Sequence, residues 1–363
     1  MICLIGNSGL KKHGLDGQTA KVRLYLQKIK DEGFDVFFID LENFLKHPIL
    51  ILRKIRKGVK MCDRIVLISA ERGCKVLIPY INKVNKKYNR KFILPLVGTS
   101  VLHYSIDKLT NDQKHNFLTN GNYATVAPNK YLIKQLSKIS YILPETDSLS
   151  RVFREYYHLD NVFTLNNFRD VKPTNYLKDI KKGTLKIVYL SRVMREKGIF
   201  DALEAVKKEN NDICSITLDI YGKKILDKKD TLLFNSLLDD NISYCGVLDN
   251  SRVIGTLSKY DLFIFPTKFV SEGTPGVIVE SLIAGTPVIT SDFPQAKLLL
   301  EDGKDSLFFK MGNATDLKGK LEFIIKHPNL LKALWMNASK RGKSYTYSVE
   351  RNRFLKYICG IEE

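Results

Sequence analysis

Two carboxylates flank a turn rich in glycine and proline in the C-terminal half of the chain. The stretch is Ser271-Glu-Gly-Thr-Pro-Gly-Val-Ile-Val-Glu280, and a strand-like run, Asp261–Pro266, comes just before it. A helix predicted from Gly276 would have unpaired N–H groups in its first turn, and such groups bind anions. Glu272 and Glu280 beside an anion site indicate a ligand that also carries hydroxyl groups. A nucleotide sugar offers both hydroxyls and a diphosphate; the alternative is a capped helix with one Glu that stabilises its dipole.

Two cations occupy a second turn between a strand-like run and a helix. The run Ile187–Leu190 leads into Ser191-Arg192-Val-Met-Arg-Glu-Lys197-Gly198. An Arg side chain can bind two phosphate oxygens at once, and a Lys side chain acts as a point charge. Because this turn accompanies the carboxylate stretch, we interpret Arg192 and Lys197 as a diphosphate site rather than as a solvated basic turn.

A third polar loop follows the first strand-like run. It is Gly6-Asn-Ser-Gly-Leu-Lys-Lys-His-Gly14-Leu-Asp16-Gly17-Gln18-Thr19. Its glycine spacing is neither the dinucleotide-binding Gly-x-Gly-x-x-Gly nor a P-loop. The glycines indicate only a close approach of the backbone to another group, or a turn with positive φ.

Short β-branched runs alternate with amphipathic helical stretches along the chain, which predicts βαβ units and parallel sheets. The predicted strands are Ile2–Ile5, Phe34–Ile39, Arg64–Ile68, Phe92–Val97, Tyr123–Val126, Tyr141–Leu143, Leu185–Leu190, Ser215–Tyr221, Ile242–Cys245, Leu262–Phe265 and Pro287–Thr290. The predicted helices include Thr19–Glu32, Leu45–Val59, Lys75–Lys87 and a final tail, Asn329–Ile358. In open α/β sheets, ligands bind at the carboxyl ends of strands, so function should lie in the loops that follow strands.

A polar segment without an apolar period, Asn166–Gly183, interrupts this alternation. Polar segments with proline and glycine often connect domains. We therefore predict an N-terminal domain over residues 1–165, a linker over 166–184, a C-terminal domain over 185–340 and a last helix over 341–363.

The composition is that of a soluble globular protein, with 363 residues of which 44% are hydrophobic and 27% are charged. No apolar run approaches the ~20 residues that span a bilayer, and the N-terminus lacks the pattern of a signal peptide. The six cysteines form no Cys-x-x-Cys pair, and Cys3, Cys214 and Cys245 lie in strand-like runs, where a thiol is a small buried hydrophobe. These features predict a cytoplasmic protein.

The formal net charge is +19, and most of it lies in the first half of the chain. Residues 1–170 hold 28 Lys and Arg against 15 Asp and Glu, a net charge of +13. The cations are densest over residues 53–91, at Arg53, Lys54, Arg56, Lys57, Lys60, Arg64, Arg72, Lys75, Lys83, Lys86, Lys87, Arg90 and Lys91. Such a field favours anionic partners, namely phosphorylated substrates, anionic lipid or nucleic acid; an ordinary solvated surface is the alternative.

One basic stretch, Phe44–Lys60, is also strongly apolar on one face. We expect that face to pack on the N-terminal sheet, as in any βαβ unit. A basic amphipathic helix can also lie at a membrane interface. Our hypothesis is that Arg53, Lys54, Arg56 and Lys57 face an anionic leaflet; the alternative is that they are merely the solvated side of the helix.

Taken together, the motifs resemble the retaining GT-B glycosyltransferases of the large family with a Glu-x7-Glu signature (family 4-like). Glu272 and Glu280, with seven residues between them, and the continuation Ser-Leu-Ile-Ala-Gly-Thr-Pro-Val-Ile match that signature. The turn Ser191–Gly198 is similar to the family's other donor motif. The segments Gly14–Thr19 and Asn166–Arg169 resemble members from bacterial capsule and exopolysaccharide clusters, so the resemblance covers nearly the whole chain.

The resemblance implies a role for each matching residue. Arg192 and Lys197 would hold the diphosphate and stabilise its charge as the glycosidic bond breaks. Glu280 would accept hydrogen bonds from the ribose hydroxyls, and Glu272, the third member of the catalytic set, from the hydroxyls of the donor sugar. Further donor contacts would come from Gly17 and from the segment Gly273, Thr274, Pro275, Gly276 and Val277, in which Pro275 has no N–H group.

Asp16, Gln18, Thr19 and His103 are the candidates on the acceptor side. Many members of the family carry a His at the end of a middle strand, but His103 comes several residues after Phe92–Val97. An ordinary surface or helix-start His is therefore the favoured interpretation of His103. A front-face retaining mechanism needs no separate base, because the departing phosphate can take the acceptor proton. No Asp-x-Asp motif is present, so the sequence requires no metal, and no other cofactor is predicted.

We therefore predict a GT-B fold of two Rossmann-like α/β domains facing across a cleft. The N-terminal domain would bind the acceptor, the C-terminal domain would bind the donor, and the helix over 341–363 would cross back to the N-terminal domain. The predicted enzyme is a hexosyltransferase that uses a UDP-sugar and a saccharide acceptor. We expect this acceptor to be lipid-linked at the inner face of the membrane, in capsule, exopolysaccharide or other surface polysaccharide synthesis.

Two alternatives belong to other functional classes. A nucleotide-sugar epimerase of similar fold would need paired acid and base groups and no acceptor; the four charged residues of the two donor motifs argue against it. A nucleic-acid-binding protein is suggested only by the net charge. No recognition motif supports it, and aromatic residues do not alternate with the basic cluster, so we predict no nucleic-acid partner.

Overall fold

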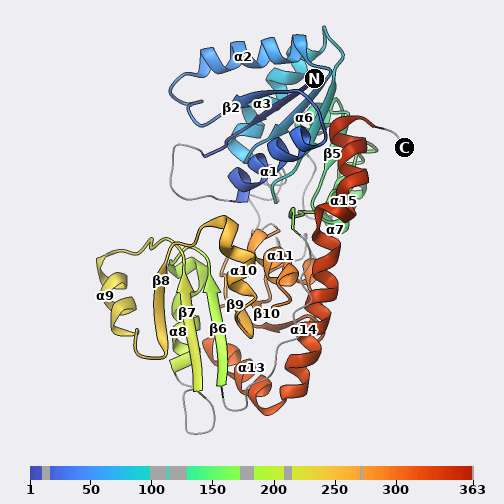
Figure 1. The fold of residues 1–363 in the computed structure, drawn as a ribbon. Helices are drawn as coiled ribbons and strands as arrows, with labels where there is room; N and C mark the ends of the chain where they lie inside the picture. The colour runs from blue at the N-terminus through green and yellow to red at the C-terminus, as the bar shows by residue number, and fades with distance from the viewer. Residues whose placement is uncertain are drawn as a thin grey trace. The chain divides into compact units, whose positions relative to one another are not determined.

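The computed structural model describes residues 1–9, 17–98, 113, 129–171, 184–207, 215–269, 272 and 274–361 (Figure 1). The chain divides into two compact units. Unit 1 consists of Met1–Asp170 together with Tyr347–Glu363, and unit 2 consists of Val171–Thr346. The predicted linker, 166–184, includes the boundary at Asp170, and the last helix of the chain is part of unit 1.

Unit 1 is built on a parallel sheet with the strand order β2-β1-β3-β4-β5. The strands are β1 (Ile2–Gly6), β2 (Val36–Asp40), β3 (Arg64–Ile68), β4 (Lys91–Pro95) and β5 (Tyr141–Leu143). The helices are α1 (Gly17–Asp31), α2 (Pro48–Met61), α3 (Glu71–Asn85), α6 (Lys130–Leu136), α7 (Asp147–Glu155) and α15 (Tyr347–Phe354), followed by a π-helical turn, η4 (Leu355–Cys359).

Helices cover both faces of this sheet. Ile2 and Leu4 of β1 pack in one cluster with residues of α1 and α15, whereas Cys3 and Ile5 pack in another with residues of α2, α3, α6 and α7. Side chains alternate between the two faces of a strand, so a strand covered on both faces must be apolar throughout. This explains the unbroken apolar run at the start of the sequence.

Unit 2 contains a six-stranded parallel sheet with the order β11-β10-β9-β6-β7-β8. Its strands are β6 (Thr184–Leu190), β7 (Ser215–Tyr221), β8 (Ile242–Gly246), β9 (Leu262–Phe265), β10 (Val288–Ser291) and β11 (Ser306–Phe309). The helices are α8 (Ile199–Lys207), α9 (Lys228–Ser236), α10 (Val253–Leu257), α11 (Gly276–Ile283), α12 (Ala296–Leu299), α13 (Ala314–Lys326) and α14 (Pro328–Gly342), with 3-10 turns η1 (Arg195–Lys197), η2 (Asn250–Arg252) and η3 (Lys343–Tyr345).

The final segment returns to unit 1 through a set of polar and aromatic contacts. Tyr347 N–H donates to the Arg169 carbonyl at 2.8 Å, next to the point where the chain leaves unit 1. Arg351 forms two hydrogen bonds to Glu32 on α1, and the Phe354 ring meets the Tyr25 ring edge-on at 5.2 Å between centroids. These contacts hold α15 against α1.

The structure confirms most of the predicted strands and helices and differs from the prediction at a few of them. The strands Arg64–Ile68, Tyr141–Leu143, Ser215–Tyr221 and Leu262–Phe265 have the predicted ends. The other predicted strands that the structure describes shift by one or two residues, and β11 was not predicted. The helical tail predicted over Asn329–Ile358 is helical over most of its length, but the backbone is extended at Thr346, which separates α14 and η3 from α15. The predicted strand Tyr123–Val126 lies outside the described residues.

The prediction that Cys245 is buried is wrong. Cys3 is buried in the middle of its sheet, but Cys245 is exposed, and Cys214 lies outside the described residues. β8 is an edge strand, and its alternate residues Ser243 and Cys245 are both exposed. The burial of a cysteine in a strand therefore depends on whether the strand lies inside the sheet or at its edge. The residue pattern of the strand does not reveal this position.

The basic helix α2 packs as expected on its sheet. It buries Ile51, Ile55 and Val59, and the five cations between Arg53 and Lys60 are all exposed. Hydrophobic side chains are also exposed near its N-terminal end, namely Leu45, Ile49 and Leu50. Among the residues that the structure describes, no helix is both long enough and apolar enough to cross a membrane.

Candidate active site

Two polar loops lie side by side at one edge of the unit 2 sheet. One follows β6 and holds Arg192 and Lys197, and the other follows β9 and holds Glu272. Because β6 and β9 are paired and parallel, their carboxyl ends meet at the same edge. The sheet order thus brings together two motifs that are 75 residues apart in the sequence, counted from Lys197 to Glu272.

Backbone contacts join the two loops closely. Gly198 has a φ of 71°, and a Cβ atom there would lie 1.8 Å from the Pro266 carbonyl oxygen, so only glycine fits. The Lys268 N–H group donates to the Glu196 carbonyl at 2.8 Å. The Lys268 ammonium also donates to Asp201 on α8 at 2.8 Å. These contacts fix the start of the loop that follows β9 against the turn that carries Lys197.

Lys197 and Glu272 contact each other directly as an ion pair. Their side chains are 9% and 15% exposed, so the pair is largely withdrawn from water. The Thr267 hydroxyl donates to Glu272 Oε1 at 3.1 Å and orients the carboxylate. Thr267 is held in turn by Ser291 of β10, whose hydroxyl donates to the Thr267 carbonyl at 2.5 Å.

The surroundings of Lys197 act on its positive charge in opposite directions, because the aromatic rings attract it and burial disfavours it. Its ammonium lies 5.5 Å from the ring centroid of Phe265 and 4.8 Å from that of Phe269. Burial, together with the positive charge of Arg192, lowers the pKa of Lys197 to about 7. The neighbouring Glu272 carboxylate opposes this by favouring the charged form. Arg192 itself is exposed, so it is available to a ligand at this edge.

The sequence patterns missed Tyr189, which holds the cationic turn in place. Its side chain is completely buried, and its hydroxyl donates to the Arg192 carbonyl at 2.9 Å and to the Lys197 carbonyl at 3.4 Å. Burial raises the pKa of Tyr189, so the hydroxyl remains a donor. The available signal was the one hydroxyl in the otherwise apolar run Ile187–Leu190, which ends at the motif. Asp201 and Lys268 were missed as well, and no sequence pattern marked them.

Helix α11 begins directly beside Glu272. Pro275 is its N-cap residue, and the N–H groups of Ile278 and Val279 donate to the Pro275 carbonyl at 3.0 and 3.4 Å. The N–H groups of Gly276 and Val277 come earlier in the first turn, where a helix has no acceptor to offer. Thr274 is half-buried before the helix, and Glu280 is half-buried one turn into it.

The other predicted site residues fall outside this edge or outside the described residues. Gly17, Gln18 and Thr19 form the first turn of α1 in unit 1, and Thr19 is buried. A Cβ atom at Gly17 would meet nothing within 4 Å, so nothing in the described protein requires glycine there. Gly273, Asp16 and His103 lie outside the described residues. The roles predicted for all six remain predictions.

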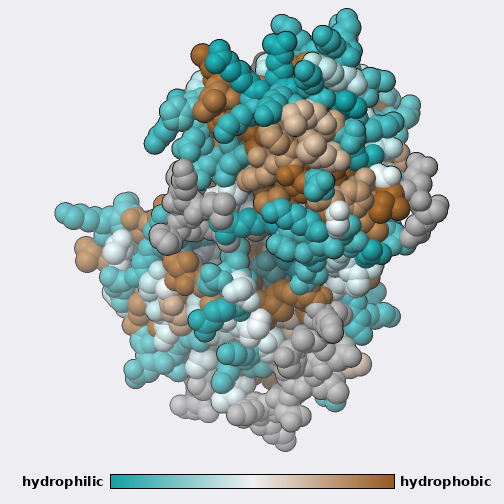
Figure 2. Space-filling model, turned by 45° about the horizontal axis from the view of Figure 1, so that its top comes forward, coloured by the Kyte–Doolittle hydropathy of each residue, from teal (hydrophilic) through white to brown (hydrophobic). Residues whose placement is uncertain are grey.

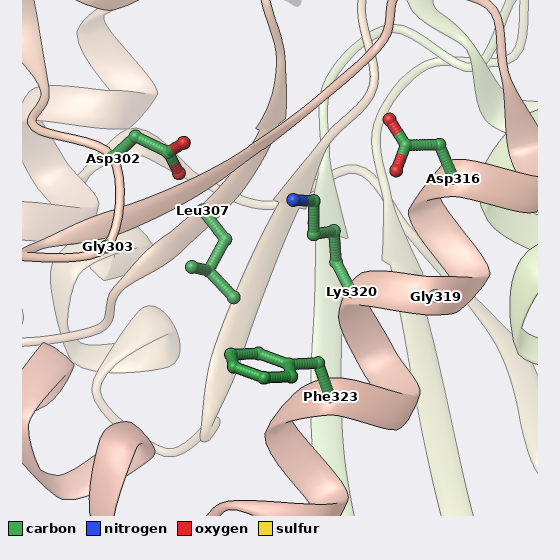
Figure 3. Close-up of a pocket in the computed structure, with 7 residues that line it drawn as sticks. All are labelled: Asp302, Gly303, Leu307, Asp316, Gly319, Lys320 and Phe323. Carbon is green, nitrogen blue, oxygen red and sulfur yellow. The ribbon is translucent and has the colours of Figure 1, made fainter.

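A cavity of about 410 Å³ opens beside the edge strand β11 (Figure 3). It is lined by Asp302, Gly303, Leu307, Asp316, Gly319, Lys320 and Phe323. Asp302 accepts from the Phe308 N–H at 2.8 Å, and Asp316 accepts from the Lys310 N–H at 2.7 Å. Asp302 thus covers an N–H group of the edge strand β11, and Asp316 covers one just after it, which opposes pairing with another strand. We therefore interpret the two carboxylates beside this cavity as groups that protect the edge of the sheet.

The described residues contain no group of three or more His, Cys, Asp or Glu side chains that could hold a metal ion. Arg192 and Lys197 are positive charges at this edge of the sheet. The expectation that no metal is required stays a prediction.

Comparisons with known proteins agree with this geometry. Residues 177–341 match the model of the family glycosyl transferases group 1. Poly(ribitol-phosphate) alpha-N-acetylglucosaminyltransferase from Staphylococcus aureus (strain COL) is 24% identical over 227 residues, which are 61% of this chain and 44% of that protein. Alpha-monoglucosyldiacylglycerol synthase from Acholeplasma laidlawii is 23% identical over 244 residues, 65% of this chain and 57% of that one. The chain spans about half the length of these curated relatives.

The fold is similar to a solved structure over the whole chain. HepE from Anabaena, solved in complex with UDP and glucose, has a TM-score of 0.69 at 12% sequence identity, with 99% of each chain covered. At this identity the likeness concerns the fold alone. It agrees with the two parallel-sheet α/β units. The chain therefore has the GT-B fold, and its residues 177–341 are similar to the glycosyl transferases group 1 family.

Proposed function

We propose that the protein is a retaining glycosyltransferase whose unit 2 binds a nucleoside diphosphate sugar. The contact between Lys197 and Glu272 at the start of α11 is the observation that carries this proposal. It combines a cation for phosphate, a carboxylate for hydroxyl groups and the free N–H groups of a helix N-terminus. A nucleotide sugar supplies the partner of each group.

In the proposed reaction, Arg192 and Lys197 bind the diphosphate and stabilise the charge that develops on it as the glycosidic bond breaks. The N–H groups of Gly276 and Val277 add to that stabilisation. Glu280 accepts from the ribose hydroxyls, and Glu272 from the donor sugar. The leaving phosphate takes the proton of the attacking acceptor hydroxyl on the same face of the sugar. We propose no metal, because the two cations provide the charge that a metal would otherwise supply.

We propose a UDP-sugar as donor and a lipid-linked saccharide as acceptor, in surface polysaccharide synthesis. UDP and glucose are named in the complex of the structural neighbour HepE. The names of two relatives describe transfer to poly(ribitol phosphate) and synthesis of a glucosyl diacylglycerol. These names support an acceptor of the cell envelope, and both donor and acceptor can be tested directly.

The surface of α2 supports contact with an anionic membrane. Its exposed cations, which include Arg53, Lys54, Arg56 and Lys57, lie on the same short segment as the exposed Leu45, Ile49 and Leu50. Figure 2 shows hydrophilic side chains over most of this part of unit 1, with smaller hydrophobic groups between them. Each cation near an anionic leaflet contributes on the order of 1 kcal/mol.

Thermal-shift measurements with UDP-, GDP-, ADP- and CMP-sugars test the donor. A ligand at about 100 times its dissociation constant stabilises a protein by ~2.7 kcal/mol. We expect stabilisation by a UDP-sugar, and none in Lys197→Ala. If no nucleotide sugar stabilises the wild type, the proposed function is wrong. Formation of an epimer from the UDP-sugar without any acceptor would support the epimerase instead.

Co-sedimentation with anionic liposomes tests the membrane contact. The bound fraction should fall steeply with added salt, because charges are screened within ~10 Å at 0.1 M. Replacing Arg53, Lys54, Arg56 and Lys57 by Glu should abolish binding and leave UDP affinity unchanged. Absence of wild-type binding at low salt would rule the contact out.

A further inference from the structure

Lys197 and Glu272 bond to each other, although the proposed reaction needs them for different parts of the donor. Lys197 would bind a phosphate oxygen, and Glu272 would bind a sugar hydroxyl. We propose that Glu272 serves as a displaceable internal anion, which neutralises Lys197 in the free protein and is released by an incoming diphosphate. This inference rests on the proposed function and adds to it a coupling between the two halves of the donor.

The buried position of Lys197 explains why it needs an internal partner. Its side chain is 9% exposed, and a buried ammonium without a counter-charge is strongly unfavourable. The rings of Phe265 and Phe269 offer attraction to a cation but no full charge. Glu272 therefore provides the negative charge that the site lacks when no phosphate is bound.

Glu272 is also held in a position from which it can leave. Its carboxylate accepts one hydrogen bond from the Thr267 hydroxyl at 3.1 Å. Its N–H donates to the Phe269 carbonyl at 3.3 Å, so the backbone stays anchored while the side chain can rotate. At 15% exposure the side chain lies at the margin of the site. A phosphate oxygen that approaches Lys197 thus competes with a carboxylate that needs only a change of rotamer.

This exchange distinguishes the donor from the product. A diphosphate without its sugar must break the ion pair and offers Glu272 no new partner. A complete donor also breaks the pair, but its sugar hydroxyls then donate to the released carboxylate. The site therefore favours the nucleotide sugar over the free nucleotide, which promotes product release after transfer.

Binding of inorganic pyrophosphate tests the coupling, because this probe has neither a base nor a sugar. Titration calorimetry at about pH 6 keeps Lys197 charged. Glu272→Gln retains the shape of the side chain and the bond from Thr267 while removing the charge. We expect this variant to bind pyrophosphate roughly tenfold more tightly than the wild type, as for the loss of a close competing charge. The matched control is Glu196→Gln, which removes an exposed charge from the same turn and should change the affinity little.

Lys197→Ala separates failure of this inference from failure of the proposed function. If Lys197→Ala loses pyrophosphate binding but Glu272→Gln binds no better than the wild type, Glu272 is not a competing anion and the anion site stands. If Lys197→Ala binds as the wild type does, the anion site itself is wrong. Should Glu272→Gln melt early, Thr267→Val gives a second test. It frees the carboxylate from its hydroxyl donor and should raise the pyrophosphate affinity about two- to threefold; unchanged affinity there would overturn the inference.

Discussion

Each unit contains a buried lysine–glutamate pair, and the two pairs differ in how fully their polar atoms are used. In unit 1, Lys21 Nζ lies 2.7 Å from Glu145 Oε1 and donates to the Leu96 carbonyl at 2.6 Å. The second carboxylate oxygen of Glu145 accepts from the Gly98 N–H at 3.2 Å. Both side chains are at most 4% exposed. This pair ties α1 to the segments after β4 and β5.

The unit 2 pair has looser surroundings. Lys197 lies against aromatic rings, and its side chain and that of Glu272 are two to five times as exposed as those of the unit 1 pair. A buried pair with every polar atom bonded contributes mainly to the order of the fold, and losing one partner leaves an uncompensated charge. A pair with few other hydrogen bonds can be exchanged for a ligand. The comparison therefore favours a structural role for Lys21–Glu145 and supports the proposed ligand binding by Lys197–Glu272.

Lys21→Ala should give the largest effect, on stability. Removing one partner of a fully buried pair costs about 3–5 kcal/mol, so the free energy of unfolding of unit 1 should fall by that amount in urea titrations. Lys197→Ala should be far less destabilising. If Lys21→Ala is as stable as the wild type, the structural role of the Lys21–Glu145 pair is wrong.

Lys197→Ala and Arg192→Ala should instead affect turnover. Losing one preorganised charge at a leaving group costs about 2–4 kcal/mol of barrier, and the circular dichroism spectrum should stay unchanged. Steady-state sugar-transfer rates measure this loss. Wild-type rates in both variants would mean that the cationic turn takes no part in the reaction.

Glu280→Gln should weaken binding of UDP and leave binding of pyrophosphate unchanged. A charged acceptor bonds a hydroxyl more strongly than an amide does, by about 1.5–3 kcal/mol for a bond to a charged group. Calorimetry should therefore show weaker UDP binding and unchanged pyrophosphate binding. Unchanged UDP affinity would make Glu280 a structural residue of α11.

Donor affinity should fall as the pH rises above about 7. Burial lowers the pKa of Lys197 to about 7 in the free protein, and a bound diphosphate raises it again. Below that pH the ammonium is already charged, so affinity is flat. Above it the protein must take up a proton on binding, which lowers affinity by up to about tenfold per pH unit. Calorimetry with a UDP-sugar measures this slope, and Lys197→Arg, which stays charged, should abolish it.

Tyr189→Phe should give the smallest effect. It removes one buried hydroxyl that bonds the carbonyls of Arg192 and Lys197, which costs about 1 kcal/mol. Because the turn loses its anchor, kcat should fall several-fold while the affinity for the acceptor stays constant. A change in stability alone, with kcat unchanged, would show that Tyr189 does not position the cations.

The sequence predicted much of the fold because parallel strands covered on both faces produce short apolar runs. It also predicted that Arg192, Lys197, Glu272 and Glu280 belong to one site, and the structure brings Lys197 and Glu272 into contact. The sequence did not reveal that Lys197 and Glu272 touch, because this depends on β9 pairing with β6, and strand order is not visible in either strand. The Lys21–Glu145 pair was missed for the same reason, since its partners are 124 residues apart.

The turn between α14 and α15 shows another limit of local patterns. Residues 342–347 are mostly poor helix formers, namely Gly, Ser, Thr and Tyr, and the backbone becomes extended at Thr346, where the chain passes from unit 2 to unit 1. Gly342 packs so closely on α11 that a Cβ atom would lie 2.2 Å from the Leu282 carbonyl oxygen. The low helix propensity was visible in the sequence, but the close packing that requires Gly342 was not.

Proton NMR of a reaction with a UDP-sugar and a lipid-linked saccharide tests the central claim most directly. The account predicts release of UDP, a new glycosidic linkage with the anomeric configuration of the donor, and neither event in Lys197→Ala. Inverted configuration would contradict the retaining mechanism. Loss of the UDP-sugar to an epimer, or no change in any UDP-sugar that the protein binds, would contradict the assignment as a glycosyltransferase.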